Sequence, residues 1–226
     1  MRKANGARRA CTAEAPYLRI VMRGAESVLD HEIVAILLGD DSTAGRQRAA
    51  EILEDHSGLP GLLHGKRRDD AKHAEPTLPE IAAITAARAL VMRSQEQELQ
   101  SRDALSSPAA VRGYLRLACG HLEHEVFMVV FLDAQNRAIA AEQLFRGTLT
   151  QTSVYPREIV KRALQRNAAA VVLAHNHPSG VAEPSVQDQV LTRTISEALS
   201  LVDVKVLDHF IVAPGAALSF AERGLI

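Results

Sequence analysis

The sequence predicts an α/β protein of the α+β kind, with a small all-helical N-terminal domain followed by a mixed sheet flanked by helices. Residues 16–100 read as short helices separated by glycine and proline, with none of the period-2 alternation typical of strands. Residues 125–132 are rich in valine and phenylalanine and lead into turn residues 133–136, which indicates a hairpin. A second apolar run, 170–174, indicates a buried strand.

The N-terminal domain is expected to hold several helices. Asp30 is a suitable cap for a helix whose apolar positions run from Ile33 to Leu38 and end at Gly39. Further helices are expected at 43–55 and 79–100, and the glycine- and charge-rich stretch 59–75 between them is expected to be a solvated connection.

A change of composition marks the domain boundary. Residues 101–108 are rich in Ser, Asp and Pro, so we expect domains 1–102 and 103–226, joined near residue 103. The second domain should contain helices at 108–117, from Pro156 onward and at 186–201, with strands at 125–132, 137–145, 170–174 and 204–212.

Composition restricts the classes of function. The 26 Lys and Arg residues balance 27 Asp and Glu residues, so no global positive field favours unspecific nucleic-acid binding. The two cysteines, Cys11 and Cys119, are too far apart for a zinc knuckle, and so few cysteines favour a reducing, cytoplasmic location. No signal-peptide core follows the basic N-terminus, and the apolar run 33–38 is far shorter than the roughly 20 residues of a membrane span.

The segment that carries chemistry begins where the buried strand meets a loop. In an extended chain His175 and His177 point to the same side and form a ligand pair. Asp188 falls in the first turn of the next helix, with Ser185 at the expected N-cap. Two histidines and one aspartate leave a fourth tetrahedral position for water, the arrangement of catalytic zinc, one ion per chain. The alternative is a strand histidine beside an ordinary helix cap.

The segments His175-Asn176-His177-Pro178-Ser179-Gly180 and Pro184-Ser185-Val186-Gln187-Asp188 resemble the JAMM metalloprotease motif in the form found in the bacterial RadC family. The resemblance extends through residues 145–149, 155–163, 207–212 and 219–225. It implies an MPN fold, a cytidine-deaminase-like mixed sheet flanked by helices, with zinc held by two His, one Asp and a water.

The resemblance also implies two catalytic side chains. In the family a glutamate on an earlier strand contacts the water on the metal, and the matching residue is Glu125, with Glu123 as its rival. Glu125 would take a proton from that water and return it to the leaving amine. The hydroxyl of Ser185 would stabilise the oxyanion, although simple capping of the helix is an alternative.

Other candidates are weaker. His121 and His124 have the i, i+3 spacing that could bind a separate metal, but their charged neighbours are equally expected of a solvated face. Asp208 and His209 fit the family pattern, and we expect them beside the ligands or in packing rather than in ligation. A zinc deaminase would need a Pro-Cys-x-x-Cys element that this sequence lacks.

The N-terminal half also resembles RadC-family proteins, which often carry a helix-hairpin-helix with a glycine-hydrophobic-glycine turn. Here no glycine lies between Gly65 and Gly113, so this region is degenerate at its expected turn, 74–79, and we do not expect DNA binding through it.

We therefore predict a zinc-dependent hydrolase of amide or isopeptide bonds, a JAMM-type metallopeptidase acting on a protein or peptide-like substrate. The alternatives are a DNA-repair or replication accessory protein with a structural zinc, for which DNA would be the partner, and a non-catalytic MPN-like interaction module. The sequence predicts no membrane partner and no particular oligomeric state.

Overall fold

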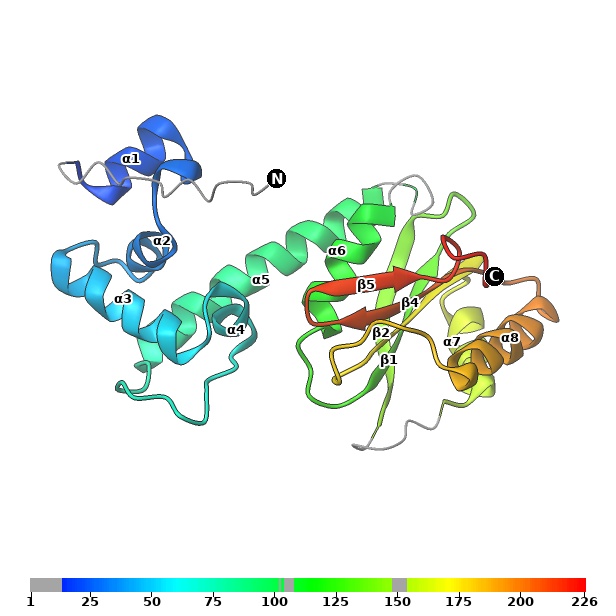
Figure 1. Cartoon of the computed structure of the whole chain (residues 1–226). Helices are drawn as coiled ribbons and strands as arrows, with labels where there is room; N and C mark the ends of the chain where they lie inside the picture. The colour runs from blue at the N-terminus through cyan, green and yellow to red at the C-terminus, as the bar shows by residue number, and fades with distance from the viewer. Residues whose placement is uncertain (1–13, 102, 104–107, 148–153) are drawn as a thin grey trace, which may run out of the picture. The chain divides into compact units, whose positions relative to one another are not determined.

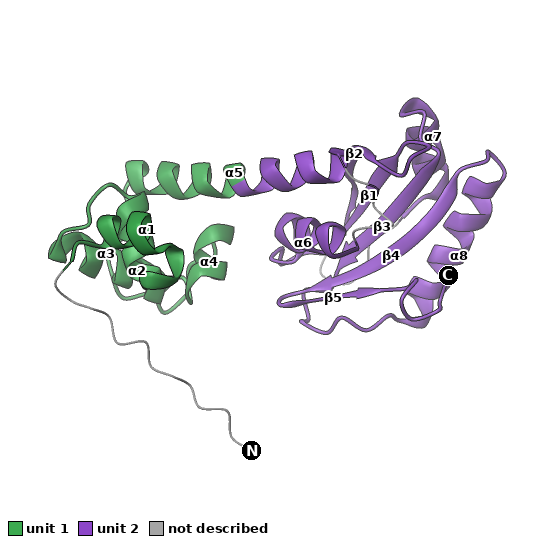
Figure 2. Ribbon diagram, turned by 90° about the horizontal axis from the view of Figure 1, so that it is seen from above, with its two compact units in different colours: residues 1–90 green, residues 91–226 purple. Residues whose placement is uncertain are grey.

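The computed structural model describes residues 14–101, 103, 108–147 and 154–226. The chain forms two compact units, one ending at Leu90 and the other beginning at Val91, within the long helix α5 (Leu78–Ser101) (Figure 2). Much of the expected linker, and residues 148 and 149 of the family pattern, lie outside the described residues, as does Cys11. The domain boundary near residue 103 stays a prediction.

The first unit is helical throughout its described residues, as predicted. It contains α1 (Pro16–Arg23), the short 3-10 helix η1 (Ala25–Ser27), α2 (Asp30–Leu37), α3 (Thr43–Asp55), α4 (Leu59–His64) and the first part of α5 (Figure 1). Its core consists of buried apolar side chains from α2 to α5: Val34, Ala35, Ala49, Ile52, Leu53, Leu62 and Ile84. None of the described helices is long and apolar enough to cross a membrane.

The expectation of a solvated connection over 59–75 was wrong for its first part, which forms α4. The reason is that Leu62 is buried in the core of this unit. The rest of the connection is held by Asp55, whose carboxylate accepts hydrogen bonds from the Arg67 guanidinium and from the backbone and ring of His73. Burial alone would raise the pKa of Asp55, but these bonds lower it well below the ordinary value.

Asp30 does not cap α2, contrary to the sequence interpretation. Leu29 occupies the N-cap position, and Asp30 is the first helical residue. The side chain that satisfies the helix start is Glu32, whose Oε2 accepts from the Leu29 amide at 2.9 Å. Its other oxygen pairs with the buried guanidinium of Arg19, so Glu32 joins α1 to the start of α2.

The second unit contains the predicted mixed sheet. Its strands are β1 (Val126–Leu132), β2 (Ala138–Arg146), β3 (Ala170–Asn176), β4 (Lys205–Ala213) and β5 (Ala216–Ser219), in the spatial order β2-β1-β3-β4-β5. Only the β3–β4 pair is parallel. β5, a four-residue strand that returns from β4 through a tight turn, was not predicted from the sequence.

Helices cover both faces of this sheet, which explains why β1 and β3 are buried at every position (Figure 1). Val126, Met128 and Val130 belong to the same core cluster as residues of α6 (Pro108–Cys119). The alternate residues Phe127 and Val129 share a second cluster with residues of α7 (Pro156–Gln165) and α8 (Val186–Ser200). The site described next lies on this second face.

Candidate metal centre

The end of β3 positions the two histidines. His175 is the sixth residue of the strand and His177 directly follows the strand, so alternation places both side chains on the face covered by α7 and α8 and Asn176 on the opposite face. In the sheet His175 lies opposite Phe127 of β1, whose ring stacks on the imidazole with 6.1 Å between the ring centroids. The strand therefore fixes the separation of the two imidazoles.

The start of α8 positions the aspartate. Ser185 is the N-cap, as predicted: its Oγ accepts from the Asp188 amide at 3.1 Å, and Asp188 Oδ2 accepts in return from the Ser185 amide at 2.7 Å. The Ser185 hydroxyl also donates to Asp188 Oδ2 at 2.7 Å. The capping box thus orients the carboxylate toward β3.

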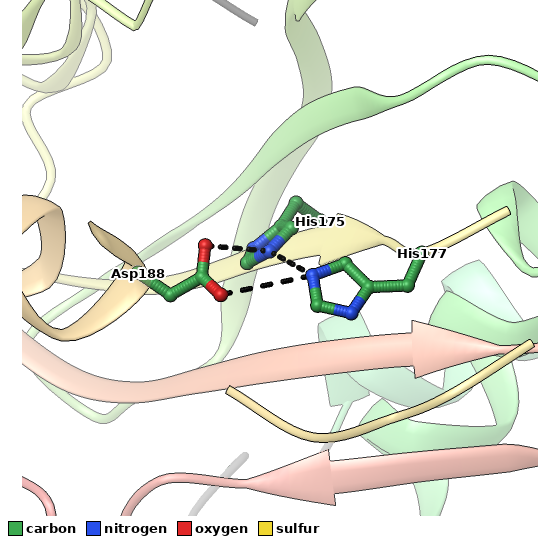
Figure 3. Close-up of side chains that lie close together, drawn as sticks. All are labelled: His175, His177 and Asp188. Carbon is green, nitrogen blue, oxygen red and sulfur yellow. Dashed lines mark hydrogen bonds and ion pairs between the residues drawn. The ribbon is translucent and has the colours of Figure 1, made fainter. Parts of the chain in front are cut away.

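The structure brings the three predicted ligands together (Figure 3). The Nε2 atoms of His175 and His177 lie 3.0 Å apart. Asp188 places Oδ1 at 3.1 Å from His175 Nε2 and Oδ2 at 3.7 Å from His177 Nε2. One potential ligand atom from each residue lies within 4.8 Å of the others.

The chemistry of these atoms fits a zinc ion. His177 Nδ1 lies 2.9 Å from the carbonyl oxygen of Val181, which can only accept, so Nδ1 carries the proton and Nε2 has a free lone pair. Burial alone would raise the pKa of Asp188, but contacts with His175 and Ser185 lower it well below the ordinary value, and the carboxylate is ionised at neutral pH. Two imidazole nitrogens and a carboxylate oxygen are the ligand types of a catalytic zinc site.

Asn176 ties the segment before β1 to the site. Its buried amide accepts from the Val126 amide at 2.8 Å and donates to the carbonyls of Leu122 and His124 at 3.1 and 3.0 Å. The β1–β3 pairing ends at Phe127 and His175, and Glu125 lies two residues before Phe127, directly ahead of β1. Glu123 is exposed, whereas Glu125 is partly buried.

Asp208 and His209 contact different parts of the structure. The Asp208 carboxylate accepts from the Ser219 hydroxyl at 2.5 Å and from the Ala221 amide at 2.9 Å, so it holds the segment after β4. His209 is fully buried, and burial lowers its pKa well below the ordinary value. Its ring lies against Phe220 and contacts His175, which places it beside the ligands as expected.

Sequence reasoning missed one residue beside the site, Thr192. Its hydroxyl contacts His209 at 2.6 Å, and the available signal was its position one helical turn after Asp188. Among the described residues, no other group of three His, Cys, Asp or Glu side chains could hold a metal ion, and His121 and His124 belong to no such group.

The comparison with known families agrees with this geometry. Residues 105–225 match the family described as the RadC-like JAB domain. The chain belongs to the RadC family. A relative from Nitrosospira multiformis is 50% identical, and the match covers 95% of this chain and 96% of the relative. A relative from Thiobacillus denitrificans is 51% identical, and the match covers 92% of this chain and 94% of the relative. Each is named a UPF0758 protein. The predicted RadC-family membership is therefore confirmed.

A cavity of about 710 Å³ lies next to the ligand cluster formed by His175, His177 and Asp188, because its lining residue Val181 contacts His177. It lies between the loop Gly180–Glu183, whose Val181 carbonyl contacts His177, and the β5 segment with Glu222 and Arg223. Arg223 pairs with Glu183 at 3.3 Å. Because β5 is the last strand in the sheet order, the cavity lies along a sheet edge.

Proposed function

We propose that this chain is a zinc-dependent hydrolase of amide or isopeptide bonds, a metallopeptidase of the JAMM type. The observation that carries the proposal is the convergence of His175, His177 and Asp188, whose ligand atoms lie within 4.8 Å of one another. Membership of the RadC family, with its JAB domain, supports the same reaction class. The three ligands leave room for a water in a tetrahedral arrangement.

The proposed catalytic roles are assigned from the residues around His175, His177 and Asp188. A zinc ion held there supplies a Lewis acid and lowers the pKa of a coordinated water to about 7. Glu125 accepts a proton from the attacking water and returns it to the leaving amine, a role worth about 10² to 10⁴ in rate. Glu125 is partly buried and directly precedes β1, the strand paired with β3, which favours it over the exposed Glu123.

Ser185 has two proposed roles that compete for one hydroxyl hydrogen. In the structure described above this hydrogen goes to Asp188 Oδ2 at 2.7 Å, which orients the ligand. During turnover the hydroxyl rotates toward the developing oxyanion and donates to it, while the Ser185 amide keeps its own bond to Asp188 at 2.7 Å.

The substrate is a protein or peptide-like chain that enters along β5. A polypeptide in extended conformation offers the backbone donors and acceptors that an edge strand lacks. The cavity beside His177 has the volume for several residues of such a chain, and Glu183 and Arg223 supply charged groups at its rim.

The first test is metal content, measured by mass spectrometry on the full chain purified without added metal. About one zinc per chain in the wild type, lost in His175→Ala, His177→Ala and Asp188→Ala, is the expected result. Gln187→Ala is the matched control, because this exposed residue lies in the same helical turn as Asp188. A folded wild type that stays free of zinc after zinc is added would overturn the proposal.

The second test separates the two glutamates. The zinc-loaded wild type, Glu125→Gln and Glu123→Gln are incubated with a library of linear and lysine-branched peptides, and the products are identified by mass spectrometry. We expect cleavage by the wild type and Glu123→Gln, and a loss of at least about 100-fold in Glu125→Gln with zinc retained. The reverse pattern would assign the proton transfer to Glu123, and absence of cleavage by the zinc-loaded wild type would contradict the hydrolase assignment.

A further inference from the structure

We propose that His209 and Thr192 form a hydrogen-bond relay that holds His175 in the tautomer presenting Nε2 to the metal. This inference rests on the proposed metal site and concerns two residues that do not bind the metal themselves. They act as positioning residues, because each works through the next side chain in the relay.

Three buried side chains and one backbone carbonyl, from three elements, form the relay. On α8 the Thr192 hydroxyl lies 2.6 Å from the backbone carbonyl oxygen of Asp188. The same hydroxyl lies 2.6 Å from Nδ1 of His209 on β4. Nε2 of His209 then lies 2.8 Å from Nδ1 of His175 on β3. The relay thus runs from the backbone of one ligand to the side chain of another.

The direction of every hydrogen bond follows from one fixed point. The Asp188 carbonyl can only accept, so the single hydrogen of the Thr192 hydroxyl is donated to it. The Thr192 oxygen must then accept from His209, which places the His209 ring proton on Nδ1. A neutral His209 has a bare Nε2, which accepts from Nδ1 of His175. Nε2 of His175 lies 3.1 Å from Asp188 Oδ1 and 3.0 Å from His177 Nε2, and with Nδ1 donating to His209 it would offer its lone pair to a metal ion held between these atoms.

His209 is suited to remain neutral and to keep this orientation. It is fully buried, and its ring packs against Phe127 and Phe220 with centroids 5.6 and 4.8 Å away. The nearest carboxylate in sequence, Asp208, is occupied by Ser219 and by backbone amides. An isolated imidazolium in such a position would be strongly unfavourable.

The two ligand histidines therefore use different partners for the same purpose. His177 donates to the loop carbonyl of Val181, which lies near solvent, whereas His175 donates to a neutral histidine in the core. Neither partner adds negative charge, so Asp188 is the one anionic side chain of the ligand cluster. Loss of a partner that orients a ligating histidine typically lowers metal affinity 10- to 100-fold.

The first experiment compares zinc affinity in matched pairs by competition with a chromogenic chelator. Thr192→Val removes the hydroxyl at similar volume, and Thr192→Ser keeps it. His209→Phe removes the ring acceptor, and His209→Gln supplies an amide oxygen in its place. We expect a loss of about 10- to 100-fold for the Val and Phe variants, and affinities closer to the wild type for the Ser and Gln variants. Equal affinities within each pair, in folded proteins, would overturn the relay.

The second experiment detects the tautomer directly. Long-range ¹H–¹⁵N correlation spectra of the wild-type chain, with and without zinc, report which nitrogen of His209 carries hydrogen. We expect the Nδ1–H form in both states, and loss of this preference in Thr192→Val. The Nε2–H form in the wild type would overturn the relay. Because this readout does not require bound zinc, a wild type that binds no zinc would refute the proposed function and leave the relay to be decided by the spectra.

Discussion

Removal of the Asn176 amide should destabilise the second unit by about 3 kcal/mol. Asn176 is 1% exposed, and its side chain makes three hydrogen bonds, at 2.8, 3.0 and 3.1 Å, to the backbone of residues 126, 124 and 122 respectively. Each such bond contributes about 0.5–1.5 kcal/mol, and leaving the buried Val126 amide without an acceptor costs about 1–3 kcal/mol by itself. Asn176→Ala removes all three bonds and fills none of the space.

Urea unfolding of the full chain, followed by circular dichroism, measures this loss. Hydrogen exchange at the Val126 amide locates it, because protection there should fall in Asn176→Ala and persist at the distant Val172 amide. Gln187→Ala is the control and should stay within about 0.5 kcal/mol of the wild type. A loss below about 1 kcal/mol with Val126 still protected would refute this reasoning.

Three further predictions concern other parts of the chain. The low pKa of Asp55 means that its ionised form stabilises the fold above about pH 4, and that this stability is lost as pH falls toward the folded-state pKa. Thermal melts from about pH 5 to about pH 3 should therefore depend less on pH in Asp55→Asn than in the wild type. Burial raises the pKa of Cys119 to about 12, so in a Cys11→Ser background iodoacetamide should modify the chain only after denaturation. Gly61→Ala would place a Cβ 1.7 Å from the His56 carbonyl oxygen, and should cost about 2 kcal/mol in urea unfolding.

Each of these has an outcome that would contradict it. A pH dependence as steep in Asp55→Asn as in the wild type would remove Asp55 from the acid response. Rapid modification of native Cys119 would show that the core between α6 and the sheet is readily exposed to solvent. Unchanged unfolding of Gly61→Ala would mean that the turn between α3 and α4 adjusts without strain.

The convergence of the three candidate ligands could be predicted because it depends on short-range geometry. Alternation along a strand places His175 and His177 on one side, and a capping box orients Asp188, so local rules suffice. The relay could not be predicted in this way, because His209 reaches His175 only through the pairing of β4 with β3. Thr192 was missed because its one signal, a position one helical turn after Asp188, does not by itself distinguish it from other helical threonines.

The errors in the fold have similar causes. The helix α4 lies in a stretch whose glycines and charged residues predict a solvated loop. It was missed because the burial of Leu62, which packs α4 into the core, can be seen only in the structure. Asp30 has the side chain of a good cap, yet Glu32 satisfies the helix start because Arg19 holds it there. Strand β5 has four residues, too few for alternation of apolar and polar side chains to be detected in the sequence. It is stabilised by its pairing with β4.

The order of the site residues along the chain has a consequence for folding. All three candidate ligands lie within residues 175–188, so closing this short loop around an ion costs little chain entropy. His209 contacts His175 only after β4 has paired with β3, and Glu125 immediately precedes β1, the strand on the other side of β3. Under the proposed function, a partly unfolded chain that has lost β4 would keep the three ligands together and lose the contact of His209 with His175, so bound metal should outlast that contact during unfolding.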